Sequence, residues 1–172
     1  MTTAALSLAG YRRRALRPDL IRSDSGPLAP VALDAPLRQL HAYWRSLAGP
    51  GDLPQRCHVE PFEIRDLLRD ILLLQAVEDG ADFEFRIAGD RIETVAGRSI
   101  RGARLGDLAG SAPGRERVLR DYRAVLETGE PHYRRDRMSA IGGQLPYRRL
   151  LLPLYAGGTL THIMGAMLFE GA

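Results

Sequence analysis

Apolar residues in the first third of the chain recur at helical spacing. Leu37, Leu40, Trp44 and Leu47 are separated by three, four and three residues, which predicts an amphipathic helix after Asp34. Residues 62–68 offer another short helix after an irregular stretch. We therefore expect residues 34–70 to form an N-terminal amphipathic helix and an irregular flanking segment.

The next residues change to a strand pattern. Residues 71–77 form an apolar run, and residues 83–87 alternate between apolar and charged side chains. Asp79 and Gly80, between these two runs, provide turn chemistry. The pattern predicts two adjacent strands in a hairpin.

A long helix follows two short helical pieces at residues 90–96 and 105–108. It is expected over residues 111–129, with Pro113 in its first turn and one apolar face. Three strand-like stretches then complete the chain, at residues 132–141, 147–155 and 160–169, separated by glycine pairs. Strands and helices that do not alternate regularly indicate an α+β fold, in which helices are segregated from one antiparallel sheet.

Charge is distributed unevenly along the 172 residues, and all 24 basic residues are arginine. Residues 1–33 carry five arginines and two acids, a balance of 5 − 2 = +3, whereas residues 34–172 hold 19 of each sign. We expect residues 1–33 to be an arginine-rich, disordered leader. The neutral body disfavours nucleic-acid binding, and no apolar run has the length of a membrane span.

Reactive side chains do not converge in the sequence. Cys57 is the single cysteine, and the four histidines lack the spacing of a metal site on a helix. Lysine-dependent chemistry is excluded, and no serine lies in a hydrolase motif. We therefore predict no catalytic residues and no metal ligands.

Several local motifs together resemble the PAS domain, and in particular a proteobacterial single-domain PAS family. A glycine-punctuated segment at residues 97–108 precedes the long helix, as it does in PAS domains. The other motifs are Arg86-x-x-Gly89, Tyr43-Trp44-Arg45, Leu53-Pro54-x-Arg56, Glu60-Pro61-Phe62-Glu63-Ile64, Leu72-Leu73-Leu74 and Leu152-Pro153-Leu154. The resemblance implies a PAS-like five-stranded antiparallel sheet over residues 71–170, with short helices and one long connecting helix on one face. Pro153 would lie in an interior strand, which predicts a bulge there.

A PAS-like fold implies a ligand pocket between the long helix and the sheet, although the same residues read more simply as filled core. Arg86 is the candidate polar anchor of this pocket. The other candidate lining residues are Phe85, Ile87, Ile92, Val95, Leu119, Tyr122 and Val125. The flavin-binding cysteine and a haem-ligating histidine on the long helix are both missing, so no cofactor is predicted and any ligand is a noncovalent small molecule.

The resemblance implies a non-enzymatic, cytoplasmic sensory or adaptor protein that acts through a helix or dimer interface on a separate effector. Leu37, Leu40, Trp44 and Leu47 either pack on their own sheet or join two protomers of a homodimer. Two other classes remain open: a small enzyme that uses the pocket, and a nucleic-acid-binding regulator that uses the arginines at positions 12–14.

Overall fold

The structure is a computed structural model that describes residues 20–48, 54–140 and 143–171. The helices are α1 (Ala35–Ser46), α2 (Asp90–Ala96), α3 (Leu105–Leu108) and α4 (Ala112–Thr128), with short 3-10 helices η2 (Pro30–Ala32), η3 (Arg56–His58), η4 (Pro61–Leu67) and η5 (Glu78–Gly80). The strands are β1 (Arg22–Ser23), β2 (Ile71–Val77), β3 (Asp82–Ala88), β4 (His132–Ala140), β5 (Gly143–Ala156) and β6 (Thr159–Phe169).

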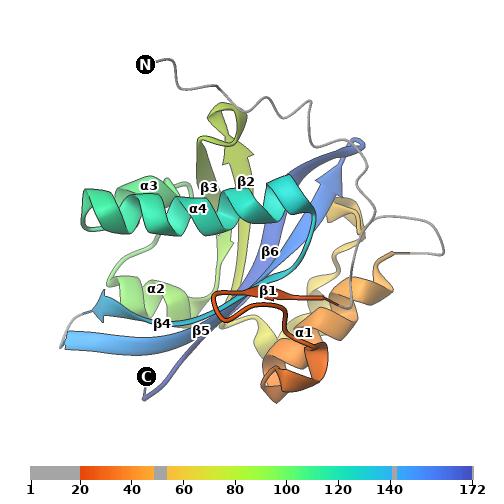
Figure 1. The fold of residues 1–172 in the computed structure, drawn as a ribbon, viewed down its shortest axis with the longest axis horizontal. Helices are drawn as coiled ribbons and strands as arrows, with labels where there is room; N and C mark the ends of the chain where they lie inside the picture. Colours follow the sequence, from red (N-terminus) through yellow and green to blue (C-terminus); the bar gives the residue numbers. More distant parts are fainter. Residues whose placement is uncertain (1–19, 49–53, 141–142, 172) are drawn as a thin grey trace.

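The strands form one sheet in the order β1-β4-β5-β6-β2-β3 (Figure 1). All pairs among strands β2 to β6 are antiparallel, which confirms the α+β class and the five-stranded antiparallel sheet. A sixth strand, β1, adds two residues in parallel beside β4.

The long helix follows from local signals in its sequence. Ser111 caps α4, because its hydroxyl oxygen accepts a hydrogen bond from the Gly114 N–H at 3.2 Å. Gly129 ends the helix in a left-handed conformation, with φ of 68°. Both residues were expected from the sequence to bound this helix.

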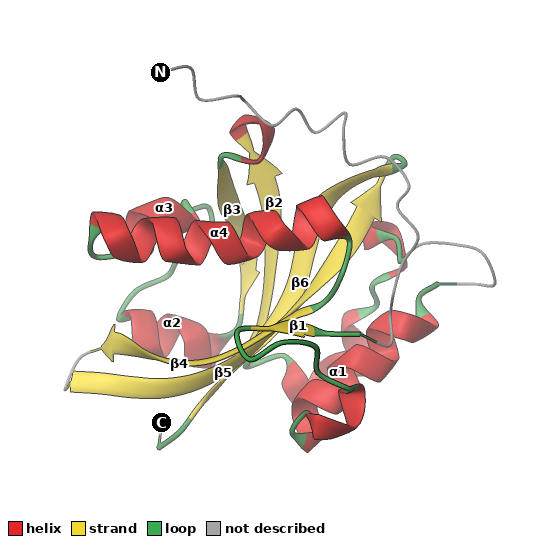
Figure 2. Cartoon of the chain, in the orientation of Figure 1, coloured by secondary structure: helices red, strands yellow, loops and turns green. Residues whose placement is uncertain are grey.

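Helices cover both faces of the sheet (Figure 2): the short helices and the long helix share one face, as expected, and the N-terminal helix lies on the other. Helices α2, α3 and α4 pack on the face that we call inner, with a core that includes Leu72, Phe83 and Leu151. Helix α1 and the η4 segment pack on the outer face, with a core that includes Leu73, Leu150 and Met164. Consecutive strand residues serve opposite cores, so the apolar runs of β2 and β5 are buried on both sides.

The α1 stripe packs on the sheet of its own chain, one of the two alternatives that the sequence left open. Leu37, Leu40 and Trp44 are fully buried in the outer core, and Leu47 is partly buried beside them. These side chains were also the dimer-interface candidates. Three of the four are covered within a single chain and are not exposed to a second protomer.

Pro153 lies where β5 has lost its neighbour on one side. The pairing of β4 with β5 ends at His132 and Leu151, so Pro153 interrupts no ladder on that side. Its carbonyl oxygen instead accepts a hydrogen bond from the Trp44 indole N–H at 2.7 Å. The predicted bulge is found one residue further on, as a register shift between Leu154 and Tyr155.

Residues 20–33 are packed against the body, although the sequence assigned them to a disordered leader. Ile21 is fully buried in the outer core, and the Arg22 N–H donates to the carbonyl of Pro131 at 2.8 Å. Arg22 also forms an ion pair with Glu130. Composition misled the expectation here, because Ile21 and Leu33 are buried in the outer core, Leu28 packs beside them, and one short strand pair holds the segment to β4. The arginines at positions 12–14 and 17 lie outside the described residues.

Candidate functional site

Six of the predicted pocket residues meet on the inner face. Phe85, Ile92, Leu119, Tyr122 and Val125 are buried in the inner core, and Val95 packs against them.

The other two predicted residues, Arg86 and Ile87, lie elsewhere because β3 contains a bulge. Leu73 pairs with Ile87 and Leu74 with Phe85, so Arg86 is an extra residue that reverses the alternation. Ile87 therefore lies opposite the outer-core residue Leu73 and is 39% exposed. Arg86 is exposed and pairs with Glu84 at 2.6 Å, so it is not a polar anchor inside the fold.

The charged side chains that are buried on the inner face lie instead between α4 and the strands β4 and β5. We call it the Asp121 cluster: Asp121, Arg134 and Arg149. Arg134 donates to both carboxylate oxygens of Asp121, from Nε at 2.6 Å and Nη2 at 2.9 Å. Arg149 donates from Nη2 to Asp121 Oδ2 at 2.5 Å. The exposed fractions of the three side chains are 4%, 8% and 3%.

Arg134 extends the Asp121 cluster to the N-terminal segment. Its guanidinium lies 2.8 Å from Asp24 Oδ2 and also donates to Asp24 Oδ1 at 3.1 Å. Asp24 directly follows β1 and is more than half exposed. One arginine therefore joins helix α4 to the segment around β1.

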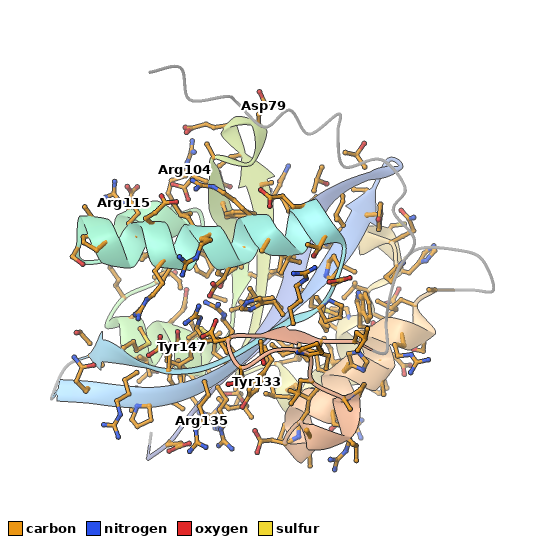
Figure 3. All side chains as sticks on the ribbon, in the orientation of Figure 1. Asp79, Arg104, Arg115, Tyr133, Arg135 and Tyr147 are labelled. Carbon is orange, nitrogen blue, oxygen red and sulfur yellow. The ribbon has the colours of Figure 1, made fainter. Side chains whose placement is uncertain are left out.

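Arg149 is less completely paired than Arg134. Its guanidinium carbon lies 4.9 Å from the ring centre of Tyr122, and Tyr147 shares its face of β5. Figure 3 shows Tyr147 on the helix side of the strands and Arg135 on the opposite side. The Nε of Arg149 is buried and has no hydrogen-bond partner among the described residues.

The ionisation of the cluster follows from its geometry. Burial by itself would raise the pKa of Asp121, but the hydrogen bond from Arg134 and the positive charge of Arg149 bring it below the usual value. Burial lowers the pKa of the neighbouring His132 to about 4, and the two arginines contribute to this shift although Asp121 opposes it. Near neutral pH the buried titratable groups are thus one negative carboxylate, two positive guanidinium groups and one neutral imidazole.

The sequence contains a signal for this cluster, although the cluster was not among the predicted sites. Asp121 lies three residues after Val118 and four before Val125, on the apolar stripe of α4. Arg149 lies between Tyr147 and Leu151 at the same strand parity. A charged residue at a position whose periodic neighbours are apolar indicates a buried ion pair.

The cluster is suited to binding and coupling more than to acid–base chemistry. Both oxygens of Asp121 accept hydrogen bonds from guanidinium groups, and its pKa is low, so it is a poor base near neutral pH. Within residues 20–48, 54–140 and 143–171, no group of three histidine, cysteine, aspartate or glutamate side chains could hold a metal ion.

The sheet order, the long helix across the inner face and the side chains beneath it define an α+β domain. A family model described as PAS domain matches residues 33–168. The chain belongs to the PAS domain family. A similar solved structure is the PAS domain from Bordetella pertussis BvgS, with 15% identity and a TM-score of 0.45, covering 63% of this chain and 85% of that chain. No curated protein sequence matches this chain.

Membership of the PAS family supports a sensory role in signal transduction in general. PAS domains are typically non-catalytic and commonly mediate ligand binding or protein–protein interaction. In the part of the chain that the structure describes, no helix is both long and apolar enough to cross a membrane. The matched residues include α1 and η4, which agrees with the packing of both on the sheet.

Proposed function

We propose that this protein is a non-enzymatic sensory or adaptor protein in signal transduction, in which an event at the inner face changes the N-terminal segment. The observation that carries the proposal is the connection from Asp121 through Arg134 to Asp24. A ligand or a partner at the inner face is the input, and the segment around β1 is the output.

The coupling has a simple physical basis. Moving α4 away from the sheet would leave the buried Arg134 without its main counter-charge, and breaking a buried pair costs on the order of 3–5 kcal/mol. Asp24, by contrast, is largely solvated and its pair with Arg134 is weak. A shift of α4 that repositions Arg134 would therefore break the ion pair between Arg134 and Asp24 before the pair between Arg134 and Asp121.

Three backbone hydrogen bonds report on the state of the N-terminal segment. Ile21 and Leu28 exchange N–H to carbonyl bonds at 3.1 and 2.8 Å, and the Arg22 N–H donates to Pro131. Hydrogen exchange of these amides measures whether the segment is docked.

The test is hydrogen-exchange mass spectrometry of the Arg134→Gln variant. We expect faster exchange of the amides of residues 21–28 while β2 and β6 keep their protection. Arg135→Gln is the matched control. Arg135 is the next residue in the strand, its side chain is exposed, and it pairs only with Glu170 among the described residues.

The reciprocal experiment uses Asp24→Asn, since coupling between two sites acts equally in both directions. This substitution lies outside the inner core, and we expect it to accelerate exchange in α4 around Asp121. Unchanged exchange in α4 would contradict the proposed coupling even if the segment itself loosened.

From the sequence we further propose that the protein is cytoplasmic, forms a homodimer and acts on a separate effector protein. Cys57 is an exposed free thiol, which fits a reducing compartment. Since Leu37, Leu40 and Trp44 are buried in one chain, the proposed homodimer uses other surfaces.

A further inference from the structure

Strand β4 is only partly paired on the side that faces away from β5. The strand order places β1 on this side, and that pairing covers His132 and Tyr133. The chain then leaves the strand at a turn over residues 24–26. In Figure 2, β1 lies beside the beginning of β4 only. Residues 134–140 are therefore paired with β5 alone in the described part of the chain, and their other side is an open strand edge.

The direction of the backbone groups identifies the residues that form this open edge. The Pro131 carbonyl accepts a hydrogen bond from the Arg22 N–H of β1, so it points away from β5. Backbone N–H and C=O groups of consecutive strand residues point to opposite sides. Arg135, Arg137 and Ser139 therefore direct their backbone groups to the same side as Pro131, which is the open edge.

The neighbours of Arg137 agree with this assignment. Arg137 lies opposite Pro146, whose carbonyl points away from β4 and accepts a hydrogen bond from the Glu170 N–H at 3.0 Å. The Arg137 N–H donates to the side chain of Asp136 at 2.8 Å, in the absence of a neighbouring strand. The other edge-facing backbone groups of the three residues have no partner among the described residues. An acceptor oxygen thus already lies where a carbonyl of an added strand would lie.

The side chains along the open edge carry an excess of positive charge. On the outer face of the hairpin, Arg135, Arg137 and Arg148 lie against two acids, Asp34 and Glu170, a balance of 3 − 2 = +1. On the inner face the charges are balanced, with Arg117, Arg134 and Arg149 against Asp24, Asp121 and Asp136. The excess belongs to Arg137, which is exposed and has no ion pair within the described ranges.

The charges decide between three candidate occupants of the edge. A second copy paired through the same strand would bring Arg135 and Arg137 against their own counterparts, and like charges on facing strands are destabilising. The leader of this chain would bring the arginines at positions 12–14 to the same place. An acidic strand would instead place a carboxylate opposite Arg137, so the charges that disfavour the first two occupants favour the third.

We propose that the open edge of β4 binds an extended acidic segment of a partner protein by strand addition. This inference rests on the proposed adaptor role and names the class of its partner. Backbone hydrogen bonds to Arg135, Arg137 and Ser139 hold the segment, and a carboxylate opposite Arg137 selects it. The parallel pairing of β1 with the first residues of β4 supports the proposal, because it is a strand added to the same edge.

The probe is a fluorescein-labelled synthetic peptide in which glutamate and valine alternate, titrated with the full chain and followed by fluorescence anisotropy. The matched peptide has lysine in place of glutamate. We expect saturable binding of the glutamate peptide and none of the lysine peptide. No saturable binding of the glutamate peptide would overturn the proposal, and so would equal binding of the two peptides.

Two further peptides separate strand addition from simple attraction between charges. Methylation of the glutamate backbone nitrogens removes the N–H donors along one edge of the extended peptide, and methylation of the valine nitrogens removes those along the other. One edge of the peptide pairs with β4, so we expect one methylated peptide to lose binding and the other to keep it. The same affinity for both would show that no strand is added.

Two variants assign the binding to the β4 edge. Arg137→Glu reverses the unpaired charge and should weaken binding of the glutamate peptide about tenfold while permitting binding of the lysine peptide. Arg65→Glu is the matched control on η4, at an exposed position outside the hairpin, and should bind as the wild type does. Unchanged binding of both peptides in Arg137→Glu would refute the site.

Ser139→Pro tests the backbone contribution without changing the charge. Proline removes an N–H that faces the open edge, which is the position where an edge strand accepts proline. We expect weaker peptide binding with an unchanged circular dichroism spectrum, and wild-type affinity in this folded variant would contradict pairing at Ser139. Arg137→Glu decides the question if Ser139→Pro does not fold.

Hydrogen exchange tests the other two occupants. The amides of Arg135 and Ser139 should exchange fast in the free protein and slow down when the glutamate peptide is bound. Slow exchange in the free protein would show that a second copy or the leader already covers the edge, and would overturn the proposal.

The peptide titrations and the exchange experiments on Arg134→Gln can fail separately. Peptide binding without coupling between α4 and residues 21–28 would refute the sensory connection and leave the edge site. Coupling without peptide binding would refute the partner class and leave the connection.

Discussion

Replacement of Trp44 by phenylalanine tests whether α1 is part of the fold of one chain. Trp44 is fully buried, and its indole N–H donates to the Pro153 carbonyl at 2.7 Å. Phenylalanine removes the donor, and a buried acceptor without a partner costs about 1–3 kcal/mol. The smaller ring leaves a void that adds on the order of 1 kcal/mol. We therefore expect Trp44→Phe to lower the free energy of unfolding by about 2–4 kcal/mol.

The loss is large relative to a typical domain stability of about 5–15 kcal/mol. It corresponds to a fall in melting temperature of about 2–4 °C per kcal/mol for a chain of this size. Because Trp44 is the single tryptophan, urea unfolding is followed by circular dichroism rather than by fluorescence. Phe62→Leu is the control, since Phe62 is 72% exposed and its replacement should change stability by less than about 0.5 kcal/mol.

Two results would refute this reasoning. One is a Trp44→Phe variant as stable as the wild type. The other is a change from dimer to monomer in sedimentation without a loss of stability, which would place the stripe between protomers.

Three further perturbations test other features. Ile21→Ala should cost about 2–5 kcal/mol, because the side chain is fully buried; a loss below about 0.5 kcal/mol in urea unfolding would show that residues 20–33 do not pack on the body. Gly165→Ala should strongly destabilise the protein in the same assay, since its Cβ would lie 2.4 Å from the Leu150 carbonyl oxygen, whereas Gly110→Ala meets no atom within 4 Å and should be tolerated. The pKa of His132 falls from 6.5 to about 4 on folding, so between these values the unfolded chain binds more protons and stability rises with pH, by up to ~3 kcal/mol. His132→Gln should flatten this dependence, and an unchanged slope would contradict the assignment.

The sequence was sufficient for elements whose signals are local. The strand at residues 71–77 and the long helix bounded by Ser111 and Gly129 are found where the periodicity and the caps predicted them. The PAS resemblance, carried by motifs on both sides of residue 71, is confirmed by the family match. Each of these features depends on residues close together in the chain.

Features that depend on pairing between distant residues were not predicted. The bulge at Arg86 is defined by the register with β2, and nothing in the sequence of β3 separates Arg86 from a regular strand residue. Asp34 illustrates the same limit: it lies at the N-cap of α1 but pairs with Arg148, which lies 114 residues away, instead of capping the helix. The Asp121 cluster was missed because a charged residue on a helix or a strand usually faces solvent, and the burial of these three depends on ion pairs between α4, β4 and β5.

The edge of β5 near Pro153, which β4 does not pair, has a consequence for how the domain can be divided. Beyond His132 this side is paired by the Trp44 indole and by Pro54, whose carbonyl accepts from the Tyr155 N–H at 2.9 Å. A chain that began at residue 71 would lose both partners and uncover the apolar outer face at the same time. An open strand edge beside an apolar surface is a template for pairing with other chains. We therefore expect such a fragment to aggregate, so the sheet and the segment that precedes it form one unit of folding.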